Sequence, residues 1–134
     1  TVQAQILELL ARLKNERDMA LMLITHDLGV VAEVCERVIV MYAGRVVEEG
    51  SVFDIFERPL HPYTLGLLQS LPDRARPGAR LPTITGSVPA PLDFSSGCRF
   101  RDRCPRAHSD CASNPPVVAD GPDHRAWCFF PESP

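Results

Sequence analysis

The chain has 134 residues, and hydrophobic residues make up 45% of them, which is ordinary for a globular protein. It contains no apolar run of about 20 residues and no basic-then-apolar leader, so we expect neither a transmembrane helix nor a signal peptide. The formal net charge of −3 argues against general binding of nucleic acids. The chain does not begin with methionine, and we expect it to be part of a longer polypeptide.

Periodic patterns in the first part of the chain predict alternating helices and strands. In chain order we expect a helix, a buried strand, a helix, two strands joined by a tight turn, and a short helix capped by Ser51, over residues 2–16, 19–25, 28–36, 37–42, 45–49 and 51–57. This order is typical of the end of an α/β sheet with a hairpin. Glu48 and Glu49 are adjacent on a predicted strand, so they point to opposite faces, and we expect both to be solvated.

Proline separates this first part from the rest, because all 13 prolines lie at or after Pro59. Proline removes a backbone donor and fixes φ, so the second part is expected to be rich in turns and loops. We therefore expect three segments, at residues 1–58, 59–97 and 98–134.

His26 directly follows the predicted strand over residues 19–25. Ligands of open α/β sheets bind beyond the carboxyl ends of the strands. A neutral imidazole there can donate a hydrogen bond to a phosphate oxygen or hold an attacking water, and phosphoryl transfer depends on such positioning. Alternatively His26 caps the next helix or bonds a nearby carbonyl, because one histidine is a weak signal. For Asp27 we expect helix capping.

Four cysteines with the spacing C-x5-C-x6-C-x16-C form a candidate metal site, namely Cys98, Cys104, Cys111 and Cys128. Four thiolates can complete one metal centre, and the ligation energy would order a segment that is rich in proline and poor in apolar residues. An iron–sulfur cluster, a zinc ion and no metal at all remain open. Zinc sites favour closer C-x2–4-C pairs, which are absent here.

Charged and aromatic residues surround these cysteines. The arginines are Arg99, Arg101, Arg103 and Arg106, and they either offset the charge of a cluster or form a solvated basic loop. We expect the aromatic residues Trp127, Phe129 and Phe130 to shield the site from water. His108 and His124 are alternative ligands, and we expect both to be bystanders.

The stretch Leu23–Leu28, with Thr25-His26-Asp27, and the stretch Ala32–Gly50 resemble ABC transporter ATPases. They are similar to the region from the switch-histidine loop to the end of the nucleotide-binding domain, and Thr1–Ile6 resembles the helix after the D-loop. The resemblance implies an α/β fold: the C-terminal part of a P-loop ABC ATPase domain, followed by an irregular, Pro-rich, Cys-containing extension. It also implies that His26 is the catalytic and ATP-binding residue, because the matching histidine of the family contacts the γ-phosphate.

The stretch Arg58–Leu68 contains His-Pro-Tyr-Thr and resembles the extension of ATPases that serve dipeptide, oligopeptide and nickel importers. From the residues alone, Pro62 suits the first turn of a helix, and His61 and Tyr63 are expected to pack at its start. The resemblance implies an ATP-binding subunit that energises the import of peptides by ATP hydrolysis.

This family resemblance also implies cofactors and partners. The cofactors are ATP and Mg²⁺, and the partners are a second identical or related ATP-binding subunit, transmembrane permease subunits and, indirectly, a periplasmic or extracellular solute-binding protein. We expect no nucleic-acid partner. The implied location is peripheral, on the cytoplasmic face of the inner membrane, where thiols stay reduced and disulfides are not expected. The Gly-rich phosphate loop, the signature segment and the Walker B acid are absent from these residues, so we expect this chain alone to be inactive.

The stretch Gly97–Pro105 also resembles the C-terminal motif of peptide-importer ATPases, some of which carry a four-iron cluster. This resemblance favours a [4Fe–4S] cluster over zinc at the four cysteines. Two other classes of function stay open: a metal-dependent regulatory or redox module, and a nucleic-acid-binding finger that uses the segment of arginines and cysteines.

Overall fold

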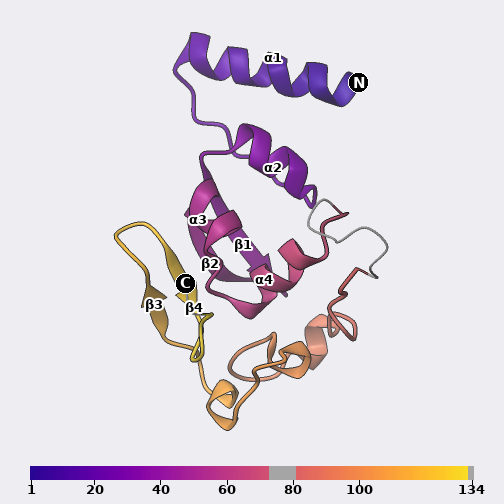
Figure 1. The fold of residues 1–134 in the computed structure, drawn as a ribbon, viewed down its shortest axis with the longest axis vertical. Coiled ribbons are helices and arrows are strands. Elements are labelled where there is room, and N and C mark those ends of the chain that lie inside the picture. The colour runs from indigo at the N-terminus through magenta and orange to yellow at the C-terminus, as the bar shows by residue number, and fades with distance from the viewer. Residues whose placement is uncertain (73–80, 133–134) are drawn as a thin grey trace. The chain divides into compact units, whose positions relative to one another are not determined.

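The computed structural model describes residues 1–72 and 81–132, and it divides into two compact units, Thr1–Glu36 and Arg37–Pro134 (Figure 1). Residues 73–80 of the predicted turn-rich extension lie outside the described part of the chain. None of the described helices combines the length and the apolar character that a membrane span requires.

The first unit contains two helices whose starts follow from capping residues. Helix α1 (Val2–Arg17) begins after Thr1, whose side chain accepts a hydrogen bond from the backbone of Ala4, and the predicted helix is confirmed. Helix α2 (Leu28–Val34) begins after Asp27, whose carboxylate accepts from the backbone N–H groups of the second and third helical residues. The expected cap at Asp27 is therefore confirmed.

The predicted buried strand over residues 19–25 is wrong for this chain. None of the described residues pairs with this segment, and the side chains of Met22 and Ile24 are 86% and 92% exposed. A strand needs a neighbour for its backbone hydrogen bonds, and apolar composition does not supply one. Val2 and Ile6, on the apolar stripe of α1, are exposed as well.

The second unit begins with the predicted hairpin. Strands β1 (Arg37–Tyr42) and β2 (Arg45–Ser51) are joined by Ala43 and Gly44, which both have positive φ, as the favoured two-residue hairpin turn requires. Two further helices follow, α3 (Val52–Glu57) after its predicted cap Ser51 and α4 (Pro62–Gln69) after His61. The hairpin and both helix starts are thus confirmed.

The C-terminal segment contributes two more strands to the same sheet. Strands β3 (Val117–Ala119) and β4 (Arg125–Trp127) form an antiparallel pair, and β4 also pairs with β2. The four-stranded sheet has the order β1-β2-β4-β3. The cysteine-containing segment is therefore built onto the hairpin rather than appended to it.

Glu48 on β2 bonds to several elements of the second unit, so the expectation that it is solvated is wrong. Its side chain has 0% exposure. One carboxylate oxygen accepts from the backbone N–H of Leu60 at 2.7 Å and from Nε2 of His124 at 2.8 Å, and the other accepts from the backbone N–H of His61 at 2.8 Å. The neighbouring Glu49 points to the opposite face, as predicted, and pairs with Arg125. One buried carboxylate therefore connects β2, the start of α4 and β4.

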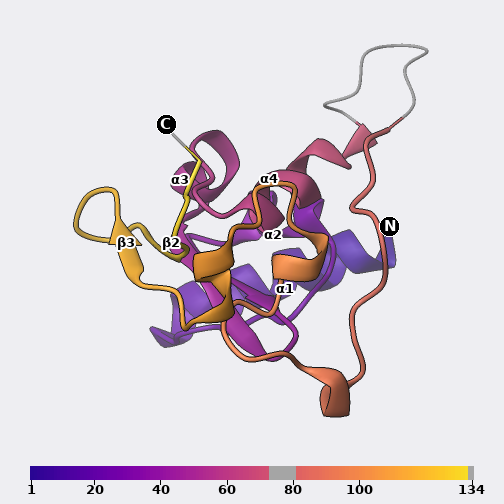
Figure 2. The ribbon, with the colours of Figure 1, turned by 90° about the horizontal axis from the view of Figure 1, so that it is seen from below.

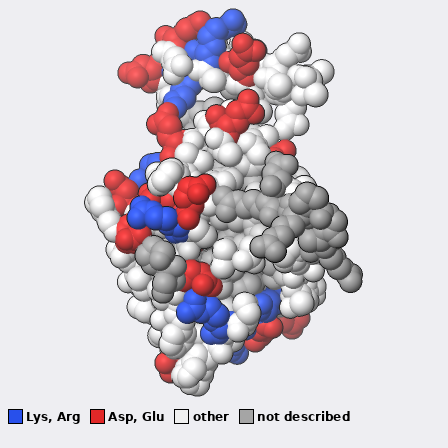
Figure 3. All heavy atoms as spheres, viewed as in Figure 1, with Lys and Arg blue, Asp and Glu red and all other residues white. Residues whose placement is uncertain are grey.

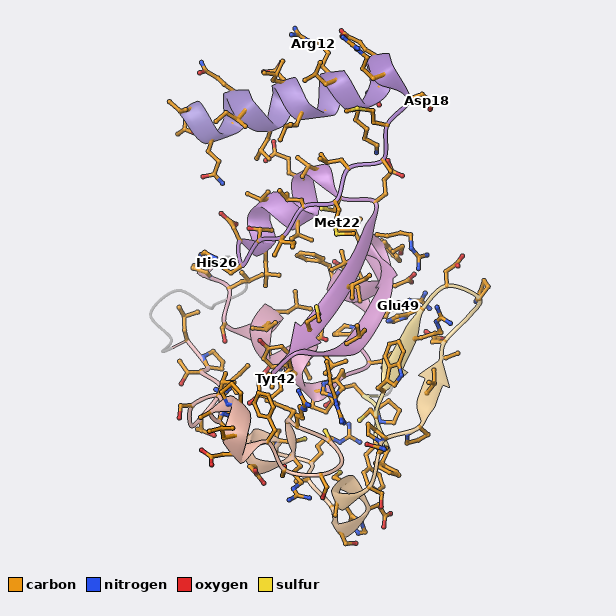
Figure 4. All side chains as sticks on the ribbon, turned by 180° about the vertical axis from the view of Figure 1, so that it is seen from behind. Arg12, Asp18, Met22, His26, Tyr42 and Glu49 are labelled. Atoms are coloured by element: carbon orange, nitrogen blue, oxygen red, sulfur yellow. The ribbon has the colours of Figure 1, made fainter. Side chains whose placement is uncertain are left out.

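An aromatic cluster joins the hairpin to the cysteine segment. Tyr42 and Phe100 are 2% and 1% exposed, and their rings meet edge to face with centroids 5.1 Å apart. The ring of Tyr63, in the first turn of α4, contacts both. Tyr42 lies at the end of β1 (Figure 4), so this small core sits where the hairpin, α4 and the cysteine segment meet.

Gly97 allows two turns of the cysteine segment to touch. Its φ is +80°, and a Cβ atom placed on it would lie 2.5 Å from the carbonyl oxygens of Cys111 and Ala112. The next residue, Cys98, donates its backbone N–H to the carbonyl of Cys111 at 2.9 Å. Only glycine fits this close approach of two backbones.

We predict that Glu48→Ala lowers the free energy of unfolding by about 3–5 kcal/mol, because it leaves buried donors without their acceptor. Glu49→Ala is the matched control on the opposite face, and its partly exposed ion pair is worth at most about 1 kcal/mol. Urea denaturation of both variants gives the comparison. If both variants lose the same free energy of unfolding, the Glu48 carboxylate does not connect these elements.

Gly97→Ala is expected to destabilise the protein more than Gly121→Ala. Gly121 has a φ of +89°, but nothing lies within 4 Å of an added Cβ, so that variant carries only the conformational cost of about 1–2 kcal/mol. At Gly97 the backbone of the facing turn must also move, which adds about 1–3 kcal/mol. The free energies of unfolding test this difference, and equal values would contradict the close approach.

Candidate functional site

The four predicted cysteines come together around one cavity of the second unit. The cavity is small, with a volume of about 10 Å³. Its lining residues are Cys98, Cys104, Cys111, Cys128, His61, Pro62, Arg101, Arg106, Pro115, Phe129 and Phe130. All four cysteines are free thiols. The predicted convergence of these residues is thus present in the structure.

Short turns make up most of the segment around residue 100, drawn in orange in Figure 2. Cys104 ends the 3-10 turn Arg101–Arg103, where its N–H donates to the carbonyl of Arg101, and Cys111 lies inside the 3-10 turn Ser109–Ala112. Cys128 directly follows β4, and its N–H donates to the carbonyl of Pro116 at 3.1 Å. Because these elements are very short, tertiary contacts rather than intrinsic propensity determine them.

The protonation of the thiols depends on burial and on charge. Burial raises the pKa of Cys98 and Cys104, and it raises the pKa of Cys128 to about 11. The other cysteines of the cavity raise these pKa values further, whereas the guanidinium groups of Arg101 and Arg106 lower the pKa of Cys98 and of Cys104 respectively. Metal ligands are thiolates, so binding of a metal here must displace protons.

Two arginines of this segment bind backbone carbonyls of other parts of the second unit. Arg103 donates to the carbonyls of Thr85 and Gly86 at 2.8 and 3.0 Å, and Arg99 donates to the carbonyl of Ala43. For these two arginines the alternative of a solvated basic loop is wrong. Positive and negative side chains are also interspersed on the face drawn in Figure 3, unlike the basic stripe typical of nucleic-acid binding.

A zinc ion and an iron–sulfur cluster require different arrangements of the four thiols. Across the described ranges, no group of three or more His, Cys, Asp or Glu side chains has a geometry that could hold a metal ion. A zinc ion needs every sulfur at about 2.3 Å from one point. Each thiolate of a four-iron cluster binds a different iron, so its four ligands are spread around a larger object. The four thiols of the cavity match the number of thiolate donors that either a four-cysteine zinc site or a four-iron cluster requires.

The aromatic residues and histidines predicted near the cavity differ in whether they line it. Phe129 and Phe130 line the cavity, as expected, whereas Trp127 is part of β4 and is not among the lining residues. His108 is exposed, and its ring packs on that of Phe130. His124 is 1% exposed and donates to Glu48, so it is a structural residue of the sheet.

His26 lies in the first unit, beside the start of α2 (Figure 4). It is exposed, and the cap of α2 is Asp27, so the alternative that His26 caps this helix is wrong. An exposed imidazole next to a helix start has room for a ligand. The phosphate contact itself stays a prediction.

His61 also lines the cavity, although the sequence did not predict this position for it. The expected packing at the start of α4 is confirmed: its Nδ1 atom accepts a hydrogen bond from the backbone of Tyr63 at 3.1 Å. Pro62 at the first helical position was the signal for this start. Its contact with the cavity could not be predicted, because 36 residues separate His61 from Cys98.

Comparisons with known proteins agree over almost the whole chain. Residues 47–111 match the family model described as "Oligopeptide/dipeptide transporter, C-terminal region". The chain is 53% identical to the probable peptide ABC transporter ATP-binding protein y4tR of Sinorhizobium fredii, over 96% of this chain and 39% of that protein. It is 48% identical to the oligopeptide transport ATP-binding protein OppD of Salmonella typhimurium, over 98% and 39%. A putative peptide import ATP-binding protein of Brucella abortus is 50% identical, over 89% and 36%.

The chain thus spans about two fifths of the length of the curated relatives it matches. Within that span the similarity includes both structural units, and the family model extends from β2 to the third cysteine of the cavity. The sequence resemblance to peptide-importer ATPases is confirmed. The chain belongs to the family of ATP-binding proteins of peptide ABC transporters, and it carries the C-terminal region of that family.

Proposed function

We propose that the chain is part of an ATP-binding subunit that energises the import of dipeptides or oligopeptides by ATP hydrolysis. The observation that carries this proposal is the match of residues 47–111 to the oligopeptide/dipeptide transporter region. Identity of 48% to 53% with proteins named as ATP-binding components of peptide transporters supports it. The cofactors are ATP and Mg²⁺. The phosphate loop and the magnesium ligands come from other residues of the subunit, and this chain alone does not hydrolyse ATP.

Within that subunit we assign His26 to the γ-phosphate of ATP. Two observations support this assignment: the side chain is exposed, and the capping of α2 is done by Asp27. The imidazole is therefore available to donate a hydrogen bond or to orient water. Stabilisation of charge at a transferring phosphoryl group needs this kind of positioned donor.

The assembly follows from the same proposal. The subunit pairs with a second, identical or related ATP-binding subunit and drives transmembrane permease subunits from the cytoplasmic face of the inner membrane, while a solute-binding protein supplies the peptide. The exposed apolar side chains Val2, Ile6, Met22 and Ile24 are consistent with burial by other parts of the subunit. The division at residues 58 and 97 remains a proposal about its domains.

We further propose that the four cavity cysteines hold a [4Fe–4S] cluster. The donor set of four cysteines and the cationic side chains of Arg101 and Arg106 at the cavity fit a group with four thiolate ligands and net negative charge. When bound, such a cluster supplies a covalent cross-link between distant segments and a site for one electron. The residues of the chain supply the thiolates, offset their charge and exclude water through Phe129 and Phe130. A zinc ion is the alternative occupant.

In the complete subunit, His26→Ala is expected to lower the rate of ATP hydrolysis by about 10²-fold, because one preorganised donor to the reacting phosphate is lost. ATP affinity should change much less. Turnover and nucleotide binding are measured on the same preparation, with His108→Ala as a control for the loss of an exposed histidine. Turnover at the wild-type level in His26→Ala would show that the assigned role is wrong.

Cys104→Ser is expected to reduce the iron content from four per chain and to destabilise the cysteine segment, because one ligand of the cluster is removed. Iron, sulfide and zinc are quantified after anaerobic purification, together with the visible absorption. Cys35→Ser is the control, since Cys35 lies at the end of α2 in the other unit. Unchanged metal content in Cys104→Ser would show that Cys104 is not a ligand. A colourless wild-type protein with one zinc per chain would show that the site holds zinc and not a cluster.

A further inference from the structure

The ring of His61 is held in one orientation by its surroundings. It is 1% exposed, its own backbone N–H donates to Glu48, and its Nδ1 atom accepts from the backbone N–H of Tyr63. The ring also lies against Phe100, with centroids 5.9 Å apart. Rotation of the imidazole would break the cap of α4, so the direction of each ring nitrogen is determined.

These contacts also determine where the proton of the ring lies. A nitrogen that accepts a hydrogen bond has no hydrogen of its own, so a neutral imidazole with Nδ1 as the acceptor carries its proton on Nε2. The burial of His61 lowers its pKa to about 4, which keeps the ring neutral near pH 7. His61 therefore presents an N–H donor at Nε2.

This donor lacks an acceptor within the described part of the chain. The Nε2 atom is buried and has no hydrogen-bond partner there, although buried donors are nearly always paired. His61 is nevertheless one of the residues that line the cavity of the four cysteines. The unpaired donor thus belongs to a residue of a cavity whose other polar side chains are those of the four cysteines and the two arginines.

We propose that Nε2–H of His61 donates a hydrogen bond to a sulfur of the centre held in this cavity, either a cysteine thiolate or a sulfide of the cluster. A neutral thiol is a weak acceptor, whereas an anionic sulfur is a strong one. Loading the cavity with a cluster therefore satisfies the buried donor. His61 is a positioning residue that acts on the cluster through this bond, and the inference rests on the cluster proposed above.

The bond has a measurable consequence for the electronic state of the cluster. A hydrogen bond to sulfur stabilises the more negative, reduced form, and such bonds are one of the factors that set the reduction potential of a cluster. The same ring caps α4, and the same residue donates to Glu48. The cluster is thereby connected to the sheet through one side chain and its backbone.

Two substitutions of His61 test its Nε2–H donor separately from its role as the cap of α4. His61→Asn places an amide oxygen near the position of Nδ1, which keeps an acceptor for Tyr63 but removes the donor at the far edge of the ring. His61→Gln reaches the position of Nε2 with an amide N–H. Thr64→Val is the matched control, because Thr64 has another buried, unpaired side-chain atom in α4 but is not among the cavity residues.

The experiment measures iron content, reduction potential and the exchangeable protons coupled to the reduced cluster, in the complete subunit purified without oxygen. We expect full iron in His61→Asn, a shift of its potential to more negative values and the loss of one exchangeable proton. His61→Gln should restore the potential at least in part, and Thr64→Val should match the wild type.

The outcomes distinguish this inference from the cluster itself. A wild-type protein without iron overturns both proposals. A wild-type cluster with the same potential and the same exchangeable protons in His61→Asn overturns only the hydrogen bond. Loss of iron in His61→Asn, with iron retained in Thr64→Val, also overturns it, because His61 would then be a ligand or a structural support of the site.

Discussion

Glu48 is an anionic side chain with no exposed surface, in an inner strand of the four-stranded sheet. Burying a carboxylate is unfavourable unless hydrogen bonds replace its water. Two backbone donors at the start of α4 and one imidazole beside β4 supply that replacement. The hairpin, α4 and the C-terminal strands must therefore come together in one arrangement, and the cavity of the cysteines forms against that arrangement.

The elements that the sequence predicted well depend on short-range signals. Thr1 and Asp27 cap α1 and α2, Ser51 caps α3, and the Ala43-Gly44 turn makes a hairpin; in each case the determining contacts lie within a few residues. The predicted strand over residues 19–25 was wrong because a strand also needs a partner, which local composition does not specify. The expected solvation of Glu48 was wrong for the same reason, since its imidazole partner is 76 residues away.

For the candidate site too, the sequence predicted some features and not those that depend on distant residues. Four cysteines in one segment were sufficient to predict their convergence, because few other residues there can organise a proline-rich chain. Their supports were hidden from the sequence: the close backbone approach at Gly97, the carbonyl contacts of Arg99 and Arg103, and the ring of His61. Each of these contacts depends on the tertiary fold. The four cysteines and His61 line one cavity, so the chemistry of a centre held there would be coupled to the start of α4.

The pairing of β2 with β4 also has a consequence for the order in which the chain matures on the ribosome. Glu48 is synthesised 76 residues before His124, which at about 5–20 residues per second corresponds to a delay of about 4–15 s. During this interval one edge of β2 has no neighbouring strand, and an open edge invites pairing with foreign chains. Glu48 and Glu49 lie on opposite faces of β2, so each face of this strand carries a negative charge that disfavours such pairing. The carboxylate that later anchors the finished fold thus protects the nascent hairpin first.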